Sequence, residues 1–236
     1  MQKLLSSVRV CLDHYNMIED GDKIAVGISG GKDSVVLLCA LAELRRFYPK
    51  TFTLEAITID PQFNNEPCDY SQINELCKRL KVNYTVKRTE LYEIIFNIRK
   101  ESNPCSLCSK MRKGALNDIA TELGCNKVAL GHHLDDAVET FYMNLFFGGN
   151  IGSFQPVNYL SRKNIHLIRP LALTNERDIA HIAKKYNLPI ITSNCTENGF
   201  TERENIKKLV RDLEKTYPDL RKKTLGAMQR SHITGW

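Results

Sequence analysis

A short polar segment near the N-terminus carries the groups that bind phosphate. Residues 29–34 read Ser-Gly-Gly-Lys-Asp-Ser and lie between an expected strand and an expected helix. Two glycines let the backbone turn tightly, and the free N–H groups at the start of a helix attract phosphate oxygens. Lys32 adds a positive charge, both serines add hydroxyl donors, and Asp33 could hold Mg²⁺ or orient the loop. The expected phosphate-site residues are Ser29, Gly30, Gly31, Lys32, Asp33 and Ser34.

Two more polar groups follow expected strands. Asp60 ends the second expected strand, and residues 131–136, Gly-His-His-Leu-Asp-Asp, follow the fourth. The carboxyl ends of parallel strands meet at one sheet edge, which is where such sheets bind ligands. Histidines and aspartates there could bind metal, take a proton or hold a nucleotide. Asp135 or Asp136 could equally cap the next helix, and Asp60 could be a solvated loop acid.

The cysteines divide by their surroundings. Cys105 and Cys108 form a CxxC pair at an expected turn, where two thiolates can hold one metal centre or form a reversible disulfide. Cys195 follows the last expected strand, and three cysteines could hold a [4Fe-4S] cluster with one iron left open. A four-cysteine zinc site would need a second close pair, which the sequence lacks. We expect buried core thiols at Cys11, Cys39, Cys77 and Cys125, and no evident partner for Cys68.

The hydrophobic pattern predicts the elements that position these groups. Strands and helices alternate, which predicts a doubly wound, mostly parallel α/β sheet with helices on both faces. Loops are expected at 102–107 and 148–164. Strands are expected at 23–28, 52–59, 83–87, 127–130 and 189–192. Helices are expected at 2–18, 34–48, 70–80, 91–100, 110–123, 135–147, 175–186, 205–217 and 219–231.

Length and composition set the class of protein. The chain has 236 residues, 42% apolar and 25% charged, which suits one domain over 1–236 and excludes a disordered, collagen-like or small disulfide-stapled chain. The longest apolar stretch, Val35–Ala42, is far short of the roughly 20 residues that span a bilayer. The start lacks a secretory apolar run, so we expect a cytoplasmic protein with no membrane partner and with reduced or metal-bound cysteines.

Positive charge is concentrated in two segments. The net charge is +6, but residues 78–115 hold ten Lys and Arg against three acids. Residues 201–236, which include the basic C-terminal helices expected at about 203–231, hold nine against five. Such segments are typical of a polyanionic partner, although they are equally compatible with an ordinary solvated surface.

The phosphate segment resembles a known class of nucleotide sites. It is not the GxxxxGK[ST] loop, so ordinary kinase or GTPase chemistry is not expected. It resembles the PP-loop ATP pyrophosphatases, which cleave ATP between the α and β phosphates and pass AMP to a substrate oxygen. The resemblance implies a fold of the adenine-nucleotide α-hydrolase type, pyrophosphate at residues 29–34, and residues 131–136 near ATP and the reacting base.

The order of three motifs points to a narrower family within this class. Pro-Cys-Ser-Leu-Cys-Ser-Lys-Met-Arg-Lys-Gly-Ala-Leu, at residues 104–116, lies between the phosphate segment and the Gly-His-His-Leu-Asp-Asp loop. This order is similar to that of tRNA 2-thiolation enzymes, closest to the tRNA 2-thiocytidine synthetase (TtcA) family. The resemblance implies that Cys105, Cys108 and Cys195 ligate a [4Fe-4S] cluster. Familiar members often carry a second Pro-Cys-x-x-Cys at the later site, whereas this chain has Ser-Asn-Cys.

The resemblance also implies a reaction. ATP would bind with Mg²⁺, the 2-oxygen of a tRNA pyrimidine, most simply cytidine, would attack the α-phosphate, and sulfur would then replace that oxygen. Arg112, one helical turn after Cys108, could stabilise the adenylate, contact tRNA or be an ordinary surface residue. The expected catalytic residues are Lys32, Asp33, Asp60, Arg112, Asp135 and Asp136. The expected nucleotide contacts are residues 29–34, Asp60, Gly131 and His132.

Alternatives remain open at this point. The modification could be 2-thiouridine or lysidine formation, although lysidine synthesis needs no metal-binding cysteines. The chain could also be a zinc-stapled RNA-binding module without turnover. The sequence leaves the sulfur donor open between cysteine-desulfurase-derived sulfur and inorganic sulfide, and it leaves a homodimer open.

Overall fold

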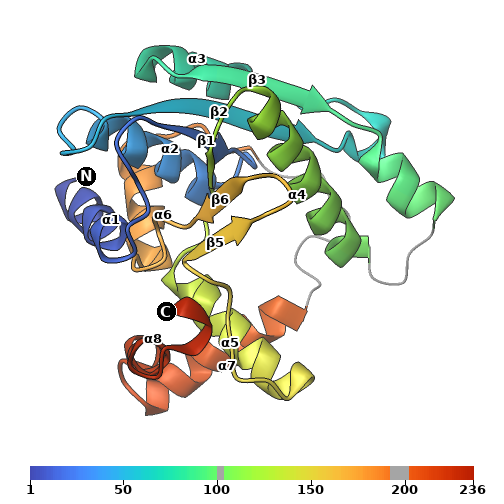
Figure 1. The fold of residues 1–236 in the computed structure, drawn as a ribbon. Helices are drawn as coiled ribbons and strands as arrows, with labels where there is room; N and C mark the ends of the chain where they lie inside the picture. The colour runs from blue at the N-terminus through green and yellow to red at the C-terminus, as the bar shows by residue number, and fades with distance from the viewer. Residues whose placement is uncertain (100–103, 192–201) are drawn as a thin grey trace.

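The computed structural model describes residues 1–99, 104–191 and 202–236 (Figure 1). Cys195, the third expected cluster ligand, therefore lies outside the described residues. The same holds for Thr192 at the end of an expected strand, and for the end of the helix expected at 91–100. Within the described ranges no helix is both long enough and apolar enough to cross a membrane.

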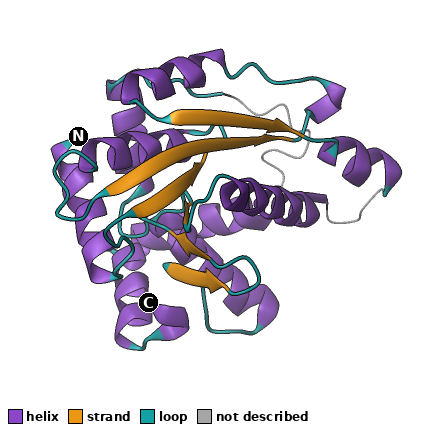
Figure 2. Ribbon diagram, turned by 45° about the horizontal axis from the view of Figure 1, so that its top comes forward, coloured by secondary structure: helices purple, strands orange, loops and turns teal. Residues whose placement is uncertain are grey.

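Six strands form one sheet in the order β3-β2-β1-β4-β6-β5, with helices on both faces (Figure 2). Only the edge strand β5 is antiparallel to its neighbour. This arrangement confirms the doubly wound, mostly parallel sheet. The chain extends from β1 through β2 to β3 on one side and returns with β4 on the other, so the strand order reverses at β1 and β4. The strands are β1 (Asp22–Gly27), β2 (Phe52–Asp60), β3 (Asn83–Arg88), β4 (Lys127–Ala129), β5 (Val157–Leu160) and β6 (Ile165–Ile168).

The helices largely follow the predicted order. Shorter elements add two 3-10 turns, η1 (Phe63–Asn65) and η3 (Ile233–Gly235), and one π-helix, η2 (Glu93–Ile98), within the helix expected at 91–100. The α-helices are α1 (Gln2–His14), α2 (Lys32–Leu44), α3 (Ser71–Leu80), α4 (Pro104–Glu122), α5 (Leu134–Gly148), α6 (Glu176–Lys185), α7 (Glu202–Thr216) and α8 (Leu220–Arg230).

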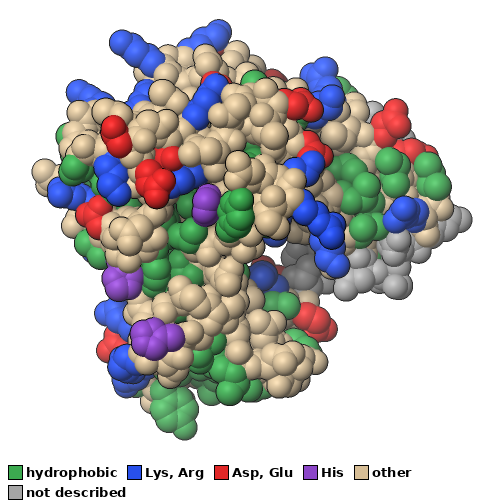
Figure 3. Space-filling model, viewed as in Figure 1, with side chains coloured by type: hydrophobic (Ala, Val, Ile, Leu, Met, Phe, Trp, Pro, Cys, Tyr) green, Lys and Arg blue, Asp and Glu red, His purple; other side chains and the backbone are tan. Residues whose placement is uncertain are grey.

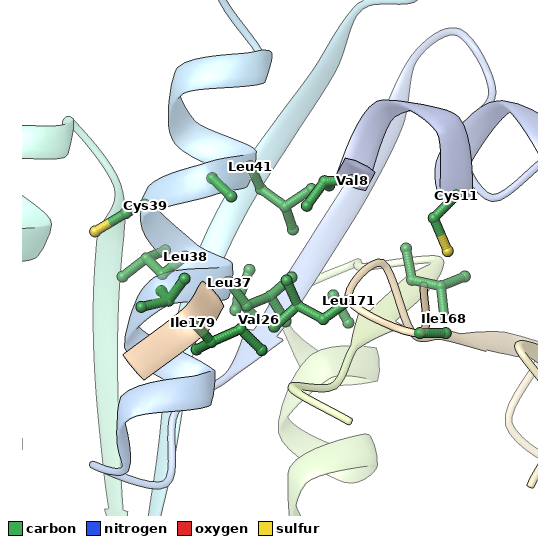
Figure 4. Packing of buried hydrophobic residues seen from close by; sticks show 14 of the residues in the cluster. Val8, Cys11, Val26, Leu37, Leu38, Cys39, Leu41, Ile168, Leu171 and Ile179 are labelled. Atoms are coloured by element: carbon green, nitrogen blue, oxygen red, sulfur yellow. The ribbon is translucent and has the colours of Figure 1, made fainter. Parts of the chain in front are cut away.

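Alternate residues of β1 face opposite sides of the sheet, as a strand requires. Ile24 and Val26 belong to the core that includes α1, α2 and α6, whereas Ala25 belongs to the core beneath α4. Figure 4 shows Val26, Leu37 of α2 and Ile179 of α6 packed close together. Because β1 and α2 are buried on all sides, the loop that joins them is held on a rigid base.

Four of the eight cysteines are part of this core, as expected. Cys11, Cys39, Cys77 and Cys125 are all at most 5% exposed. Burial raises the pKa of each thiol to about 11 or 12, so all four remain protonated and unreactive at neutral pH.

The structure differs from the predicted elements in several places, the first being the helix expected at 2–18, which ends at His14. The CxxC pair lies in α4 rather than in a loop or turn, because Pro104 occupies the start of the helix, where its missing N–H costs nothing. Part of the loop expected at 148–164 forms β5, which pairs with β6 in a hairpin. The Gly, Asn and Ser content of this segment had indicated a loop. Residues 189–191 form no strand, although the Ile191 N–H donates to the Gly30 carbonyl at 2.9 Å.

Candidate active site

The phosphate segment forms the tight turn between β1 and α2. Gly30 has a φ of +87°, and a Cβ on it would lie 3.1 Å from Cβ of Ile191, so this position requires glycine. Ser34 Oγ donates to the Gly31 carbonyl at 2.9 Å and accepts the Ser29 N–H at 3.2 Å. Gly31 is the N-cap of α2 and has no side chain that could cap the helix. The two serines thus hold the turn, and the first N–H groups of α2 can receive an anion.

A cavity of about 540 Å³ lies beside this turn. Asp60, the last residue of β2, is 1% exposed, and its carboxylate accepts the N–H groups of Gln62 at 3.0 Å and Cys68 at 3.1 Å. Asp60 therefore shapes the loop that closes this cavity, and Cys68 lies on the cavity wall. The expected site residues that line it are Ser29, Gly31, Lys32, Asp33, Asp60 and Arg112.

Lys32 lies between two carboxylates. Its Nζ is 3.2 Å from Asp33 Oδ1 and 2.9 Å from Glu176 Oε1, at the start of α6. Burial alone would lower the pKa of Lys32, but the hydrogen bond to Glu176 and the charges of both carboxylates raise it overall. The ammonium is therefore fully charged at neutral pH.

A second cavity, of about 350 Å³, adjoins the first. Ser29, Phe63 and Arg112 line both cavities. The wall of the second cavity is mostly apolar and includes Gly27, where a Cβ would lie 2.8 Å from Leu116 Cδ2. Gly27 thus lets β1 and α4 approach closely, and no local sequence pattern marked this position. The other lining residues are Ile28, Ile57, Ile59, Phe96, Cys105, Cys108, Ser109, Lys113, Leu116, Leu130 and His132.

The CxxC pair lies on one face of α4 because residues three apart are neighbours on a helix. Cys105 is exposed, Cys108 is 9% exposed, and both line the second cavity. Among residues 1–99, 104–191 and 202–236, no three His, Cys, Asp or Glu side chains are grouped as metal ligands. Two thiols facing one cavity fit part of a cluster site, and they are too few to hold a cluster alone.

The loop 131–136 packs directly on the phosphate turn. A Cβ on Gly131 would lie 3.0 Å from Ser34 N, so the close approach requires glycine. His132 lines the second cavity and accepts a hydrogen bond from Arg169 at 3.3 Å. Burial, and then the charge of Arg169, lower the pKa of His132 to about 4, so the ring is neutral at pH 7. The sequence offered no local signal for Arg169, which reaches the site from beyond β6.

The two aspartates of this loop hold helices together. His133 is the N-cap of α5 and forms a capping box with Asp136, so Asp136 belongs to the cap. Asp135 accepts the Glu176 N–H at 2.7 Å and pairs with Arg221 Nε of α8 at 2.8 Å. Neither aspartate is among the residues that line the two cavities. The geometry of Asp136 matches the helix-capping alternative, whereas Asp135 contacts α6 and α8 instead of capping α5. A catalytic role for either stays a prediction.

Basic side chains border the site. Figure 3 shows Lys and Arg side chains over α4, beside a hollow between this helix and the part of the molecule that carries α5 and α7. On α4, Lys110 is exposed and Arg112 and Lys113 are partly exposed. Polyanions are attracted to such a rim.

Comparisons with known proteins agree with this geometry. A family model described as the PP-loop domain matches residues 4–213, and the chain belongs to this class. The tRNA-cytidine(32) 2-sulfurtransferase of Syntrophotalea carbinolica is 38% identical over 217 residues, or 91% of this chain and 83% of the relative. The same enzyme of Pelobacter propionicus is 36% identical over 98% of this chain and 86% of the relative. The chain therefore belongs to the tRNA-cytidine(32) 2-sulfurtransferase family, which confirms the resemblance to the TtcA family.

A solved structure supports the fold. The U34-tRNA thiolase NcsA from Methanococcus maripaludis, with its [4Fe-4S] cluster, matches with a TM-score of 0.76. The match covers 95% of this chain and 78% of NcsA at 22% identity, so it is evidence for the shared fold.

Proposed function

We propose that this chain is an ATP-dependent tRNA sulfurtransferase that converts cytidine at position 32 of tRNA to 2-thiocytidine. One observation carries the proposal: the phosphate-loop cavity and the cavity of Cys105 and Cys108 share the wall formed by Ser29, Phe63 and Arg112. Nucleotide activation of the 2-oxygen and cysteine-dependent sulfur chemistry at C2 can thus take place on one pyrimidine. The names of the relatives support the choice of cytidine over uridine.

ATP extends across the shared wall in this proposal. Its phosphates occupy the larger cavity, at the start of α2 and beside Lys32. Asp33 and Asp60 line the same cavity, and carboxylate oxygens are the donors that Mg²⁺ prefers, so the site fits this ion. Adenine occupies the apolar walls of the smaller cavity, around Ile57 and Leu130. The α-phosphate then lies near Ser29, which lines both cavities.

The first step activates the pyrimidine. Its 2-oxygen attacks the α-phosphate, the bond to the β-phosphate breaks, and pyrophosphate leaves. Lys32 and the N–H groups of α2 stabilise the charge on the departing pyrophosphate, and Arg112 stabilises the adenylate. The pyrimidine oxygen, otherwise a poor leaving group, now departs as AMP.

The second step replaces the activated oxygen with sulfur. A sulfide-equivalent nucleophile attacks C2, and the C2–O bond breaks to release AMP. Cys105, Cys108 and Cys195 would hold a [4Fe-4S] cluster, which when bound supplies an open iron for sulfur. The apolar wall around the two α4 cysteines excludes water, which would otherwise hydrolyse the adenylate. The sulfur donor is either inorganic sulfide or cysteine-desulfurase-derived sulfur that a thiol reductant brings to the oxidation level of sulfide.

The basic surfaces, the single domain and the cellular location belong to the same proposal. The basic rim of α4 and the basic helices α7 and α8 contact tRNA phosphates. Residues 1–236 act as one PP-loop domain, with α1 packed on α2 and with α7 and α8 packed on α5. Because its substrate is tRNA, the protein works in the cytoplasm, and a homodimer is compatible with this arrangement.

The test is nucleoside mass spectrometry of tRNA from cells with and without this gene. We expect deletion to remove 2-thiocytidine and wild-type protein to restore it. Lys32→Ala should fail to restore it, because Lys32 stabilises the pyrophosphate. Loss of 2-thiouridine instead would redirect the proposal to the other base, and an unchanged set of thionucleosides would refute it.

A further inference from the structure

A chain of charges connects the phosphate turn to α7. Glu176 Oε1 is 2.9 Å from Lys32 Nζ, and Glu176 Oε2 is 2.9 Å from Lys207 Nζ. The side chains of Lys32, Glu176 and Lys207 are 29%, 24% and 26% exposed, so solvent screens their charges only in part. The carboxylate at the start of α6 thus bridges the proposed ATP lysine and a lysine of a helix outside the phosphate loop.

The charges around Lys32 create a difficulty for phosphate binding. Lys32 contacts both Asp33 and Glu176, and two carboxylates on one ammonium compete with any incoming phosphate. Glu176 stays ionised: burial would raise its pKa, but hydrogen bonds from Lys207 and Lys32 hold that pKa down at about 2. The competition therefore persists at every physiological pH.

We propose that Lys207 is a positioning residue that neutralises Glu176 and so leaves Lys32 available to the phosphates of ATP. Lys207 shares the carboxylate through its own hydrogen bond, at 3.0 Å from Oε1. Because Lys207 shares the negative charge of Glu176, Glu176 orients the Lys32 ammonium but attracts it less strongly. The inference rests on the proposed function in taking ATP as the ligand, and it assigns α7 a role in nucleotide binding that is separate from tRNA contact.

A matched control lies on α6, the helix that carries Glu176. Asp178 of α6 pairs with Lys3 of α1 at 3.0 Å, and it makes no contact with Lys32 or Lys207 among those the structure gives. Asp178→Asn therefore removes an acid and an ion pair from α6 while leaving the Lys32–Glu176–Lys207 chain intact.

The experiment measures binding of α,β-methylene-ATP with Mg²⁺ by calorimetry. Lys207→Met should weaken binding about fivefold, the strength of one partly exposed charge pair. Lys207→Arg should stay near wild type because it keeps the charge. Adding Glu176→Gln to Lys207→Met should restore binding, since the competing carboxylate is gone. Asp178→Asn should bind as wild type does.

The outcomes separate this inference from the proposed function. Wild-type affinity in Lys207→Met, or a double variant no better than that single one, would overturn the inference alone. If Lys207→Met weakened binding by disturbing the packing of α7, adding Glu176→Gln would not restore it. Restored binding therefore indicates an electrostatic effect. If Lys207→Met fails to fold, Glu176→Gln alone decides: affinity at or above wild type supports the inference, and weaker binding overturns it. A wild-type chain that binds no nucleotide would refute the proposed function itself.

Discussion

At the scale of single residues, the cysteines differ in what surrounds them. Cys105 and Cys108 line the smaller cavity, whereas the thiol of Cys125 is buried beside β4, away from both cavities. We therefore expect Cys105→Ser and Cys108→Ser each to abolish thiolation while nucleotide affinity stays within about twofold. Neither residue lines the phosphate cavity, and serine nearly keeps the size of cysteine in the wall of the cavity proposed for adenine. Thiolation and nucleotide-binding assays on the same preparations measure this.

Cys125→Ala is the matched control for the cysteine variants. It removes a buried thiol from the core and should cost roughly 1 kcal/mol of unfolding free energy while thiolation persists. Retained thiolation in either α4 variant would remove that cysteine from the proposed cluster site. Equal loss of nucleotide binding would instead indicate general damage to the fold.

The site residues that the sequence revealed are those with a local pattern. The Gly-Gly turn, the CxxC pair and the Gly-His-His-Leu-Asp-Asp loop each combine several informative residues within a few positions. Arg169 and Gly27 lack such a pattern, since their importance arises only when distant segments meet at His132 and at Leu116. Gly27 is the last residue of β1, two positions before Ser29 at the start of the turn, and this position was the one available signal.

At the scale of elements, α5 and α7 meet through a buried acid. Glu139 of α5 is 3% exposed, and its Oε2 is 3.6 Å from Arg203 Nη1 of α7. Burial, and then the charge of Asp136, raise the pKa of Glu139 to about 7. Between its ordinary pKa of 4.5 and this value, the unfolded chain ionises Glu139 before the folded chain does, so rising pH lowers stability.

Glu139→Gln should remove this pH dependence, because glutamine cannot ionise. Relative to wild type, we expect its unfolding free energy to increase by roughly 2 kcal/mol between pH 5 and pH 8. Urea titrations at both pH values measure the change, and Glu75→Gln, at an exposed position of α3, serves as the control. A difference that stays constant with pH would mean that Glu139 remains ionised as the partner of Arg203.

Elements were predicted well where the hydrophobic pattern repeats over many residues. Helices such as α2 and α6 and the strands β1 and β2 were recovered because their buried faces repeat over many residues. The hairpin of β5 and β6 was missed because β5 has four residues and lies at the sheet edge, where side chains are only partly buried. The start of α4 was missed because Pro, Cys and Ser weaken the helical pattern, although proline suits the first turn.

At the scale of the whole molecule, the reversal of strand order at β1 and β4 decides where the chemistry takes place. The phosphate turn follows β1, Asp60 ends β2, and the loop 131–136 follows β4, so one sheet edge brings together segments a hundred residues apart. The first half of α4 lines the smaller cavity at this edge and adds the two cysteines and a basic rim. The fold thus places the proposed nucleotide site, the two α4 cysteines and the proposed tRNA surface side by side.

In the proposed reaction the pyrimidine oxygen leaves as part of AMP. A tRNA made with [2-¹⁸O]cytidine tests it directly when incubated anaerobically with the iron-loaded protein, ATP, Mg²⁺ and sulfide in unlabelled water. We expect one ¹⁸O atom in AMP for each 2-thiocytidine formed, as measured by mass spectrometry. AMP without the label, alongside 2-thiocytidine, would contradict adenylation of the base.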